Sequence, residues 1–132
     1  MIGLDTSVLV RHLTDDDPVQ SPRAHSIFEA LTPTEPGFIS ITALVETQWV
    51  LRRSYGYSKA QVEQAVHALL ASSDLVVEAA DSLRAALGLA AQTGADFADC
   101  LIQVSGARRG CSVTYTFDRR ATRLAGMAEP AE

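Results

Sequence analysis

Acidic residues interrupt apolar segments of the chain at four places. Asp5 directly follows the apolar run formed by residues 1–4, and Asp118 follows a second apolar run near the end of the chain. Glu46 and Asp99 each lie among apolar residues that have helical spacing. Because a lone ionised carboxylate is costly to bury, four such positions call for a common explanation.

A divalent cation would explain carboxylates of this kind. Carboxylates that converge repel one another and raise their own pKa values unless a cation neutralises them. Asp and Glu oxygens, without His or Cys at matching positions, suit Mg²⁺ or Mn²⁺ better than zinc. Such ions commonly act on phosphates, where they polarise the phosphoryl oxygen and activate water. Asp96, one helical turn before Asp99, is a further member of this group.

Each of these carboxylates also has a purely structural interpretation. Asp5 and Asp96 could cap the helices that follow them, and Glu46 could form an ion pair with an arginine. The run Asp15, Asp16 and Asp17 is expected to be a solvated turn. Two of the candidate carboxylates lie at strand ends and two lie within apolar helices. A purely structural role is a weaker explanation for all four together than for each one alone.

Other conspicuous residues are expected to have ordinary structural roles. His12, His25 and His67 are scattered without partner spacing, so we expect separate surface or core positions. The following aromatic residues and thiols are expected to be buried: Phe28, Phe38, Trp49, Phe97, Phe117, Cys100 and Cys111.

Short apolar strands alternate with helical segments along the chain. Strands are predicted at residues 1–4, 37–41, 75–77 and 113–117, and helices at residues 7–13, 18–31, 42–53, 58–70, 81–92, 96–109 and 119–125. This alternation predicts an α/β fold with a parallel sheet that is covered by helices on both faces. Ligands bind beyond the carboxyl ends of the strands in such folds, and Asp5 and Asp118 lie at two of these ends.

Length and composition restrict the class of protein further. The 132 residues, 47% of them hydrophobic, fit one folded domain over residues 1–132. No apolar run approaches the roughly 20 residues of a membrane span, and no basic segment typical of a secretory signal is seen at the start. Two cysteines form no disulfide framework. We therefore expect a cytoplasmic protein without a membrane partner.

The net charge of −5 argues at first against a nucleic-acid-binding protein, since most of these are basic. The chain has 16 acidic and 11 basic residues, and removing the five candidate carboxylates from the 16 leaves 11. The rest of the chain is thus formally neutral. An acidic balance of this size is what a metal site without its ions would produce, and bound ions would turn it into a receptor for phosphate.

Four segments resemble the motifs of the PIN domain family, especially its VapC-type ribonuclease toxins. In chain order they are residues 2–11, 40–46, 94–102 and 116–121. Their order and spacing match over nearly the whole chain. The resemblance implies a three-layer α/β/α sandwich with a central, mainly parallel sheet.

The resemblance also implies an activity and a set of site residues. The activity is that of an endoribonuclease that uses Mg²⁺, or Mn²⁺ as a substitute, and acts as the toxin of a bacterial toxin–antitoxin pair. Asp5 and Asp99 would be the principal metal ligands. Asp118 would complete the site, Asp96 would assist, and Glu46 would bind metal or orient the attacking water.

Supporting residues and partners follow from the same motifs. Thr6 and Thr116 match polar positions that support the site in this family, and Arg11, Arg119 and Arg120 are candidates for contacts with RNA phosphates. The implied partners are RNA, a small antitoxin, and further copies of the chain in a homodimer or a larger assembly. A closing fifth strand is expected to be brief or absent, because the tail from about residue 127 is short and interrupted by proline.

Other classes of protein fit the chain less well. A phosphoacceptor receiver domain usually has a lysine at the end of a late strand, and the one lysine, Lys59, lies at a helix start. A haloacid-dehalogenase-like phosphatase needs a carboxylate two residues after Asp5, where Ser7 stands. The main alternative is a non-catalytic PIN-like interaction module whose carboxylates are incidental. Such a module would have no Mn²⁺ site that depends on them.

Overall fold

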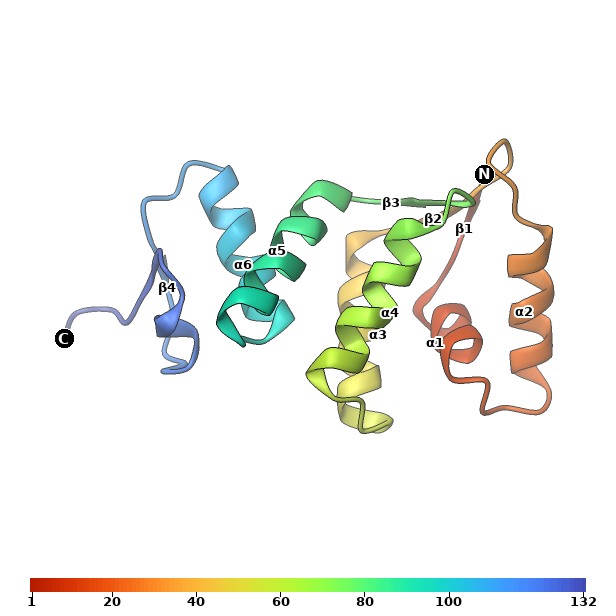
Figure 1. Ribbon diagram of the computed structural model, residues 1–132, viewed down its shortest axis with the longest axis horizontal. Coiled ribbons are helices and arrows are strands. Elements are labelled where there is room, and N and C mark those ends of the chain that lie inside the picture. Colours follow the sequence, from red (N-terminus) through yellow and green to blue (C-terminus); the bar gives the residue numbers. More distant parts are fainter. The chain divides into compact units, whose positions relative to one another are not determined.

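The computed structural model describes all 132 residues as two compact units, Met1–Ala79 and Ala80–Glu132 (Figure 1). Each unit combines helices with parallel strands. The chain contains no helix that is both long and apolar enough to cross a lipid bilayer.

The first unit is built on three short parallel strands, β1 (Ile2–Gly3), β2 (Gly37–Ile39) and β3 (Leu75–Val77). The strands lie in the order β1-β2-β3, with Ile2 opposite Gly37 and Phe38 opposite Val76. The helices of this unit are α1 (Thr6–Thr14), α2 (Gln20–Ala30), α3 (Ile41–Ser54) and α4 (Lys59–Ala71). The central strand β2 therefore leads directly into α3.

The central strand begins with a glycine for a steric reason. A Cβ atom at Gly37 would lie 2.8 Å from a methyl group of Leu4, 3.0 Å from one of Leu31 and 3.1 Å from one of Leu75. Three leucine side chains thus occupy the space that a side chain would need. The close approach lets the leucines cover the start of the strand.

Two helices of the first unit begin with side chains that accept hydrogen bonds from backbone N–H groups. The hydroxyl of Ser58 accepts a hydrogen bond from the N–H of Gln61 at 3.1 Å, and the Gln61 side chain accepts one from the N–H of Ser58 at 2.9 Å, which completes a capping box for α4. At α2, Asp17 Oδ1 accepts the N–H of Gln20 at 2.7 Å. The Gln20 side chain accepts a hydrogen bond from Arg11 instead, so Asp17 and Gln20 form only half of a capping box.

The second unit contains two packed helices, α5 (Ala80–Thr93) and α6 (Phe97–Arg108). Its strands, β4 (Thr114–Tyr115) and β5 (Met127–Ala128), pair in parallel. Gly94 and Gly110 follow the two helices with φ values of 73° and 90°, in the left-handed region that glycine adopts without strain. A single 3₁₀ turn, Ala121–Arg123, replaces the helix predicted over residues 119–125.

The α/β class and the parallel pairing of the strands are confirmed. The strands are divided between two sheets, one in each unit, whereas the sequence predicts one central sheet. Strand β2 is shorter than predicted because Ser40 caps α3, with its hydroxyl accepting the N–H of Ala43 at 3.1 Å. The fifth strand is present as the two-residue β5, which agrees with the expectation that it is brief.

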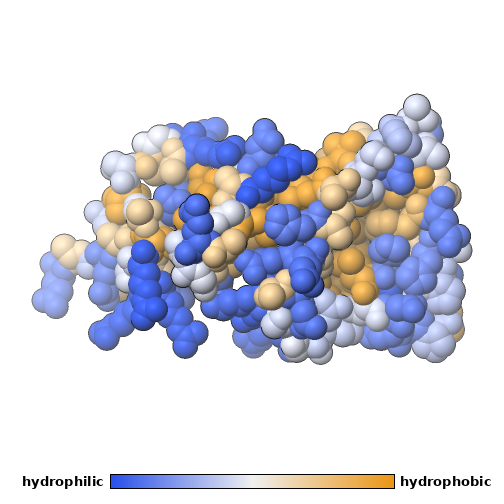
Figure 2. Space-filling view, viewed as in Figure 1, coloured by the Kyte–Doolittle hydropathy of each residue, from blue (hydrophilic) through white to orange (hydrophobic).

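Burial follows helix periodicity more closely than residue type. Phe97 and Cys100 are buried as predicted, but Trp49 is 54% exposed and Phe117 is 82% exposed. Trp49 lies on the outer face of α3, and Phe117 lies beyond the end of β4, so these two predictions of burial are wrong. Cys111 is exposed as well. Figure 2 shows other apolar side chains at the surface among hydrophilic ones.

Candidate active site

Asp5 lies between β1 and α1, at the N-cap position of the helix. Its backbone carbonyl accepts hydrogen bonds from the N–H groups of Val8 and Leu9 at 3.0 and 3.1 Å. Its carboxylate accepts a hydrogen bond from the hydroxyl of Ser7 at 3.0 Å and caps no backbone N–H of α1. Capping therefore does not explain the acidic side chain at this position. The carboxylate is exposed and accessible to a ligand.

The carboxyl ends of the three strands of the first sheet bring further polar groups to one edge. Asp5 follows β1, Ser40 follows β2 and Glu78 follows β3, and parallel strands end at the same edge. Glu78 Oε1 accepts the N–H of Ile41, the first residue of α3, at 2.8 Å. Ser40 and Glu78 together fix the start of the helix that carries Glu46.

Glu78 is a residue that the sequence reasoning misses. The signal that identifies Asp5, a carboxylate directly after a predicted strand, also applies to Glu78 after the strand at residues 75–77. In the structure Glu78 acts as a positioning residue, because it binds the backbone of α3.

Glu46 lies on the exposed side of α3. The inward side of the helix carries Ala43, Leu44, Thr47, Gln48 and Leu51, all of which are buried. No ion pair joins Glu46 to an arginine, so the structural interpretation offered for this carboxylate is not what the structure shows.

Asp96 and Asp99 lie one turn apart at the start of α6. Asp96 occupies the N-cap position, and its backbone carbonyl accepts the N–H of Cys100 at 3.0 Å. The position is that of a helix cap, but the Asp96 side chain caps no N–H of the helix. Both carboxylates are half-buried.

Asp118 lies in the exposed loop after β4 and organises that loop through two hydrogen bonds. Its Oδ1 accepts the N–H of Arg120 at 2.9 Å, and its own N–H donates to the hydroxyl of Thr116 at 3.0 Å. Thr116 thus holds the backbone of Asp118 directly. The side chains of Arg119 and Arg120 are exposed in the same loop, whereas Thr6 is buried at the start of α1.

Arg11 is already engaged within the first unit. Its Nε donates to Gln20 at 2.8 Å, and its Nη1 donates to Asp16 and to the hydroxyl of Tyr55, both at 3.1 Å. The hydrogen bond to Asp16 raises the pKa of Arg11 above its usual value. These bonds hold the Arg11 guanidinium against α2, Asp16 and the end of α3, and restrict its freedom to turn toward RNA.

The acidic run at residues 15–17 forms the exposed connection between α1 and α2, as the sequence predicts, and its side chains are also hydrogen-bonded. Asp16 accepts hydrogen bonds from Thr14 at 2.8 Å and from Arg11, and the Thr14 bond is the main reason that the pKa of Asp16 is lowered. Asp17 accepts the N–H of Gln20 at the start of α2, which lowers the pKa of Asp17 as well. The run is a structured connection because each carboxylate finds a donor nearby.

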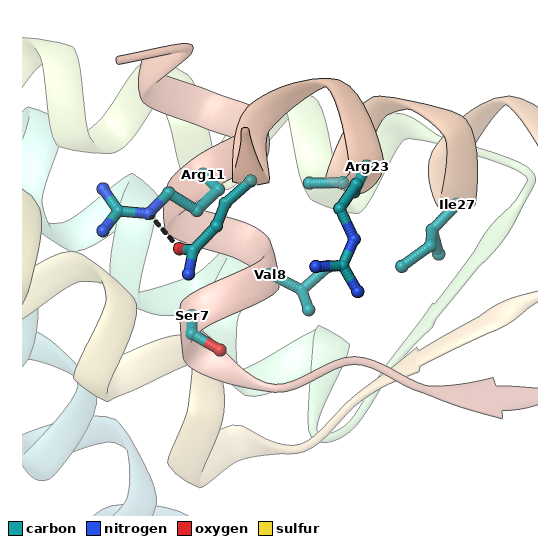
Figure 3. A pocket seen from close by; sticks show the side chains of 7 residues that line it. Ser7, Val8, Arg11, Arg23 and Ile27 are labelled. Carbon is teal, nitrogen blue, oxygen red and sulfur yellow. Dashed lines mark hydrogen bonds between the residues drawn. The ribbon is translucent and has the colours of Figure 1, made fainter. Parts of the chain in front are cut away.

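A shallow groove lies between α1 and α2, close to Asp5 (Figure 3). Ser7, whose hydroxyl donates to Asp5, is part of its lining. The other lining residues are Val8, Arg11, Gln20, Arg23, Ala24 and Ile27. Arg23 brings a positive charge to this lining, whereas the charge of Arg11 is paired with Asp16.

Two histidines that the sequence places apart lie together between the same helices. The Nδ1 atoms of His12 and His25 are 2.9 Å apart, and His25 Nε2 is 2.8 Å from Asp15 Oδ1. The His12 ring also stacks on Phe28, with 3.7 Å between the ring centroids. The sequence shows no partner spacing for these histidines, and the two packed helices supply the partners instead.

This pair makes the stability of the first unit depend on pH. Burial, and then the neighbouring His25, lower the pKa of His12. The pKa of an unfolded histidine is about 6.5. The stability that neutral His12 contributes is therefore complete above that pH. It decreases as the pH falls toward the lower pKa of the folded state, because protons then bind the unfolded chain more readily than the folded one. We expect the melting temperature to fall from about pH 7.5 to about pH 5.5 by more in the wild type than in His12→Gln. His67→Gln, on an exposed histidine, is the matched control. Equal falls in wild type and His12→Gln would contradict this assignment.

Within neither unit do three or more His, Cys, Asp or Glu side chains gather so that they could hold a metal ion. Of the candidate carboxylates, Asp5 and Glu46 belong to the first unit, and Asp96, Asp99 and Asp118 belong to the second. Their assignment to one centre stays a prediction.

Comparison with known proteins identifies the family. The PIN domain model matches residues 2–127, and the chain therefore belongs to the PIN domain family. Among solved structures, the chain is similar to the crystal structure of VapC20 from Mycobacterium tuberculosis, described as a Sarcin-Ricin loop cleaving toxin. The two share 21% sequence identity with a TM-score of 0.48, over 98% of this chain and 100% of that chain. None of the curated proteins matches the chain.

Proposed function

We propose that the chain is a metal-dependent endoribonuclease and the toxin of a type II toxin–antitoxin pair. The observation that carries this proposal is the PIN family match over residues 2–127, a range that includes Asp5, Glu46, Asp99 and Asp118. The geometry of Asp5 supports it, because its exposed carboxylate precedes α1 without capping it.

The chemistry of the donor set fits Mg²⁺ or Mn²⁺. All the candidate ligands are carboxylates, the groups that hard cations prefer. We assign Asp5, Asp99 and Asp118 to hold the ion, with Asp96 assisting. When bound, the ion would polarise the phosphodiester and lower the pKa of the attacking water.

The remaining roles fall to side chains that are fixed by their own contacts. Glu46 would accept a hydrogen bond from the attacking water and orient it, on a helix whose start is held by Ser40 and Glu78. Thr116 would keep Asp118 in place through the backbone N–H. No nucleophilic side chain and no covalent intermediate are needed.

RNA binding by an acidic chain requires local basic groups. Arg119 and Arg120 are exposed beside Asp118 and are proposed to contact RNA phosphates. We assign Arg11 a lesser part, since its guanidinium is bound to Asp16 and Tyr55. A small antitoxin and a second copy of the chain are the proposed protein partners.

Calorimetric titration with Mn²⁺ tests the metal centre and separates a nuclease from a non-catalytic interaction module. We expect the wild type to bind Mn²⁺ and the Asp5→Asn and Asp99→Asn variants to lose most of that binding. Asp81→Asn is the matched control, because Asp81 is an exposed carboxylate paired with Arg84 on α5. Mn²⁺ binding that is equal in wild type, Asp5→Asn and Asp99→Asn, or absent from all three, would favour the module.

A further inference from the structure

One exposed face of α3 carries an aromatic ring close to Glu46. Trp49, three residues after Glu46, is 54% exposed and lies on the same side of the helix. The guanidinium carbon of Arg53, one turn further on, lies 5.3 Å from the centroid of the Trp49 ring. The face thus presents a carboxylate, an indole and a guanidinium in sequence along the helix.

The packing of α3 does not account for the tryptophan. The helix packs inward through a different set of side chains, which ends with Leu51 at 1% exposure. A large aromatic side chain is normally buried, because its apolar area contributes strongly to the core. An indole that is held at the surface by a cation is, instead, a platform on which a planar ring can stack.

We propose that Trp49, together with Arg53, is a stacking site for a nucleobase of single-stranded RNA, next to the phosphate that Glu46 serves. This stacking site rests on the proposed ribonuclease activity, and it specifies how the protein would hold its RNA substrate. Stacking on an indole tolerates any base, because every base has a π face. Arg53 would add a charge-assisted contact to a neighbouring phosphate.

The surroundings of Trp49 favour a nucleic acid over a second copy of the chain. The exposed residues nearest along this face are Thr42, Glu46 and Arg53, which are polar or charged. A stable protein–protein interface needs a contiguous patch with a core depleted in charge. An exposed indole beside a guanidinium instead combines a stacking platform with a positive charge, as surfaces that bind single-stranded nucleic acid do.

The test uses the fact that Trp49 is the only tryptophan in the chain. The probe is a single-stranded RNA of mixed sequence, titrated with EDTA present so that the proposed metal-dependent cleavage cannot proceed. We expect saturable quenching of the tryptophan fluorescence in the wild type. For variants, anisotropy of the labelled probe gives the affinity. We expect Trp49→Ala to weaken binding by about 5- to 100-fold and Trp49→Phe to weaken it less, as base–aromatic stacking predicts.

A matched control and an assembly measurement make the outcomes distinct. Val19→Ala changes another exposed apolar residue of the first unit, 66% exposed, and should leave RNA affinity unchanged. Unchanged RNA affinity in Trp49→Ala overturns the stacking site. If sedimentation also shows that the wild type self-associates and that this variant does not, the face is assigned to self-association. If the wild type cleaves RNA with metal but its tryptophan fluorescence is not quenched, the stacking site is overturned and the proposed nuclease is not. Quenching without cleavage supports the stacking site and contradicts the proposed nuclease.

Discussion

Replacing Asp5 or Asp99 by asparagine should abolish metal-dependent RNA cleavage without unfolding the protein. Asparagine keeps the shape of the side chain and one oxygen, but it removes the negative charge that a hard cation requires. Losing a group that merely orients a metal ligand lowers metal affinity or activity by about 10- to 100-fold. Losing a principal ligand should therefore reduce the cleavage rate by more than about 100-fold.

The structure allows the loss of activity at Asp5 to be separated from a loss of stability. The Asp5 side chain is exposed, and its hydrogen bond comes from the hydroxyl of the equally exposed Ser7. Surface substitutions of this kind change the free energy of unfolding by only about 0.5 kcal/mol. Cleavage assays should be paired with thermal melts, with Asp81→Asn as the control. A stable Asp5→Asn or Asp99→Asn protein that cleaves RNA at the wild-type rate would contradict the assigned roles.

The second large effect is expected in the core of the first unit. Ile39 is fully buried at the end of the central strand β2, and its carbonyl accepts the N–H of Glu78 at 2.9 Å. Ile39→Ala would leave a cavity beside the strand end that positions Ser40 and Glu78. The free energy of unfolding should fall by about 2–5 kcal/mol, the range for truncating a buried aliphatic side chain to alanine.

A substitution on the neighbouring strand provides the comparison. Val76 on β3 pairs with β2 and is 45% exposed, so Val76→Ala removes apolar volume without opening a buried cavity. We expect it to lower the free energy of unfolding by less than about 1 kcal/mol. Urea denaturation of both variants measures the difference. A loss of equal size in the two variants would show that β2 is not the centre of this core.

Local signals in the sequence were sufficient for many elements. The strand Leu75–Val77 lies where the sequence predicts it, and the helix after Ser58 begins where the sequence predicts a helix, because neighbouring residues determine both. Contacts between residues far apart in the chain were not predictable in this way. The His12–His25, Ile41–Glu78 and Arg11–Tyr55 contacts join positions that are 13, 37 and 44 residues apart. Such contacts depend on how helices and strands pack.

The exposure of Trp49 shows where reasoning from residue type fails. Hydrophobicity predicts that Trp49 is buried, but its position three residues after Glu46 places both on one side of α3. Helical periodicity places the two side chains on one side of α3, so an exposed Glu46 implies an exposed Trp49. For the candidate site, the sequence motifs were sufficient to identify the family, whereas the roles of the carboxylates in those motifs stay predictions. They did not reveal Glu78, because it belongs to none of the four motifs.

The cleavage of a structured RNA by the purified wild-type chain, with Mn²⁺ or with EDTA, tests the proposed function most directly. We predict discrete fragments with Mn²⁺, none with EDTA, and none from the Asp5→Asn variant under either condition. Folded wild-type protein that cleaves no structured RNA at any Mn²⁺ or Mg²⁺ concentration would contradict the proposed function. Equal cleavage with Mn²⁺ and with EDTA would contradict its metal dependence.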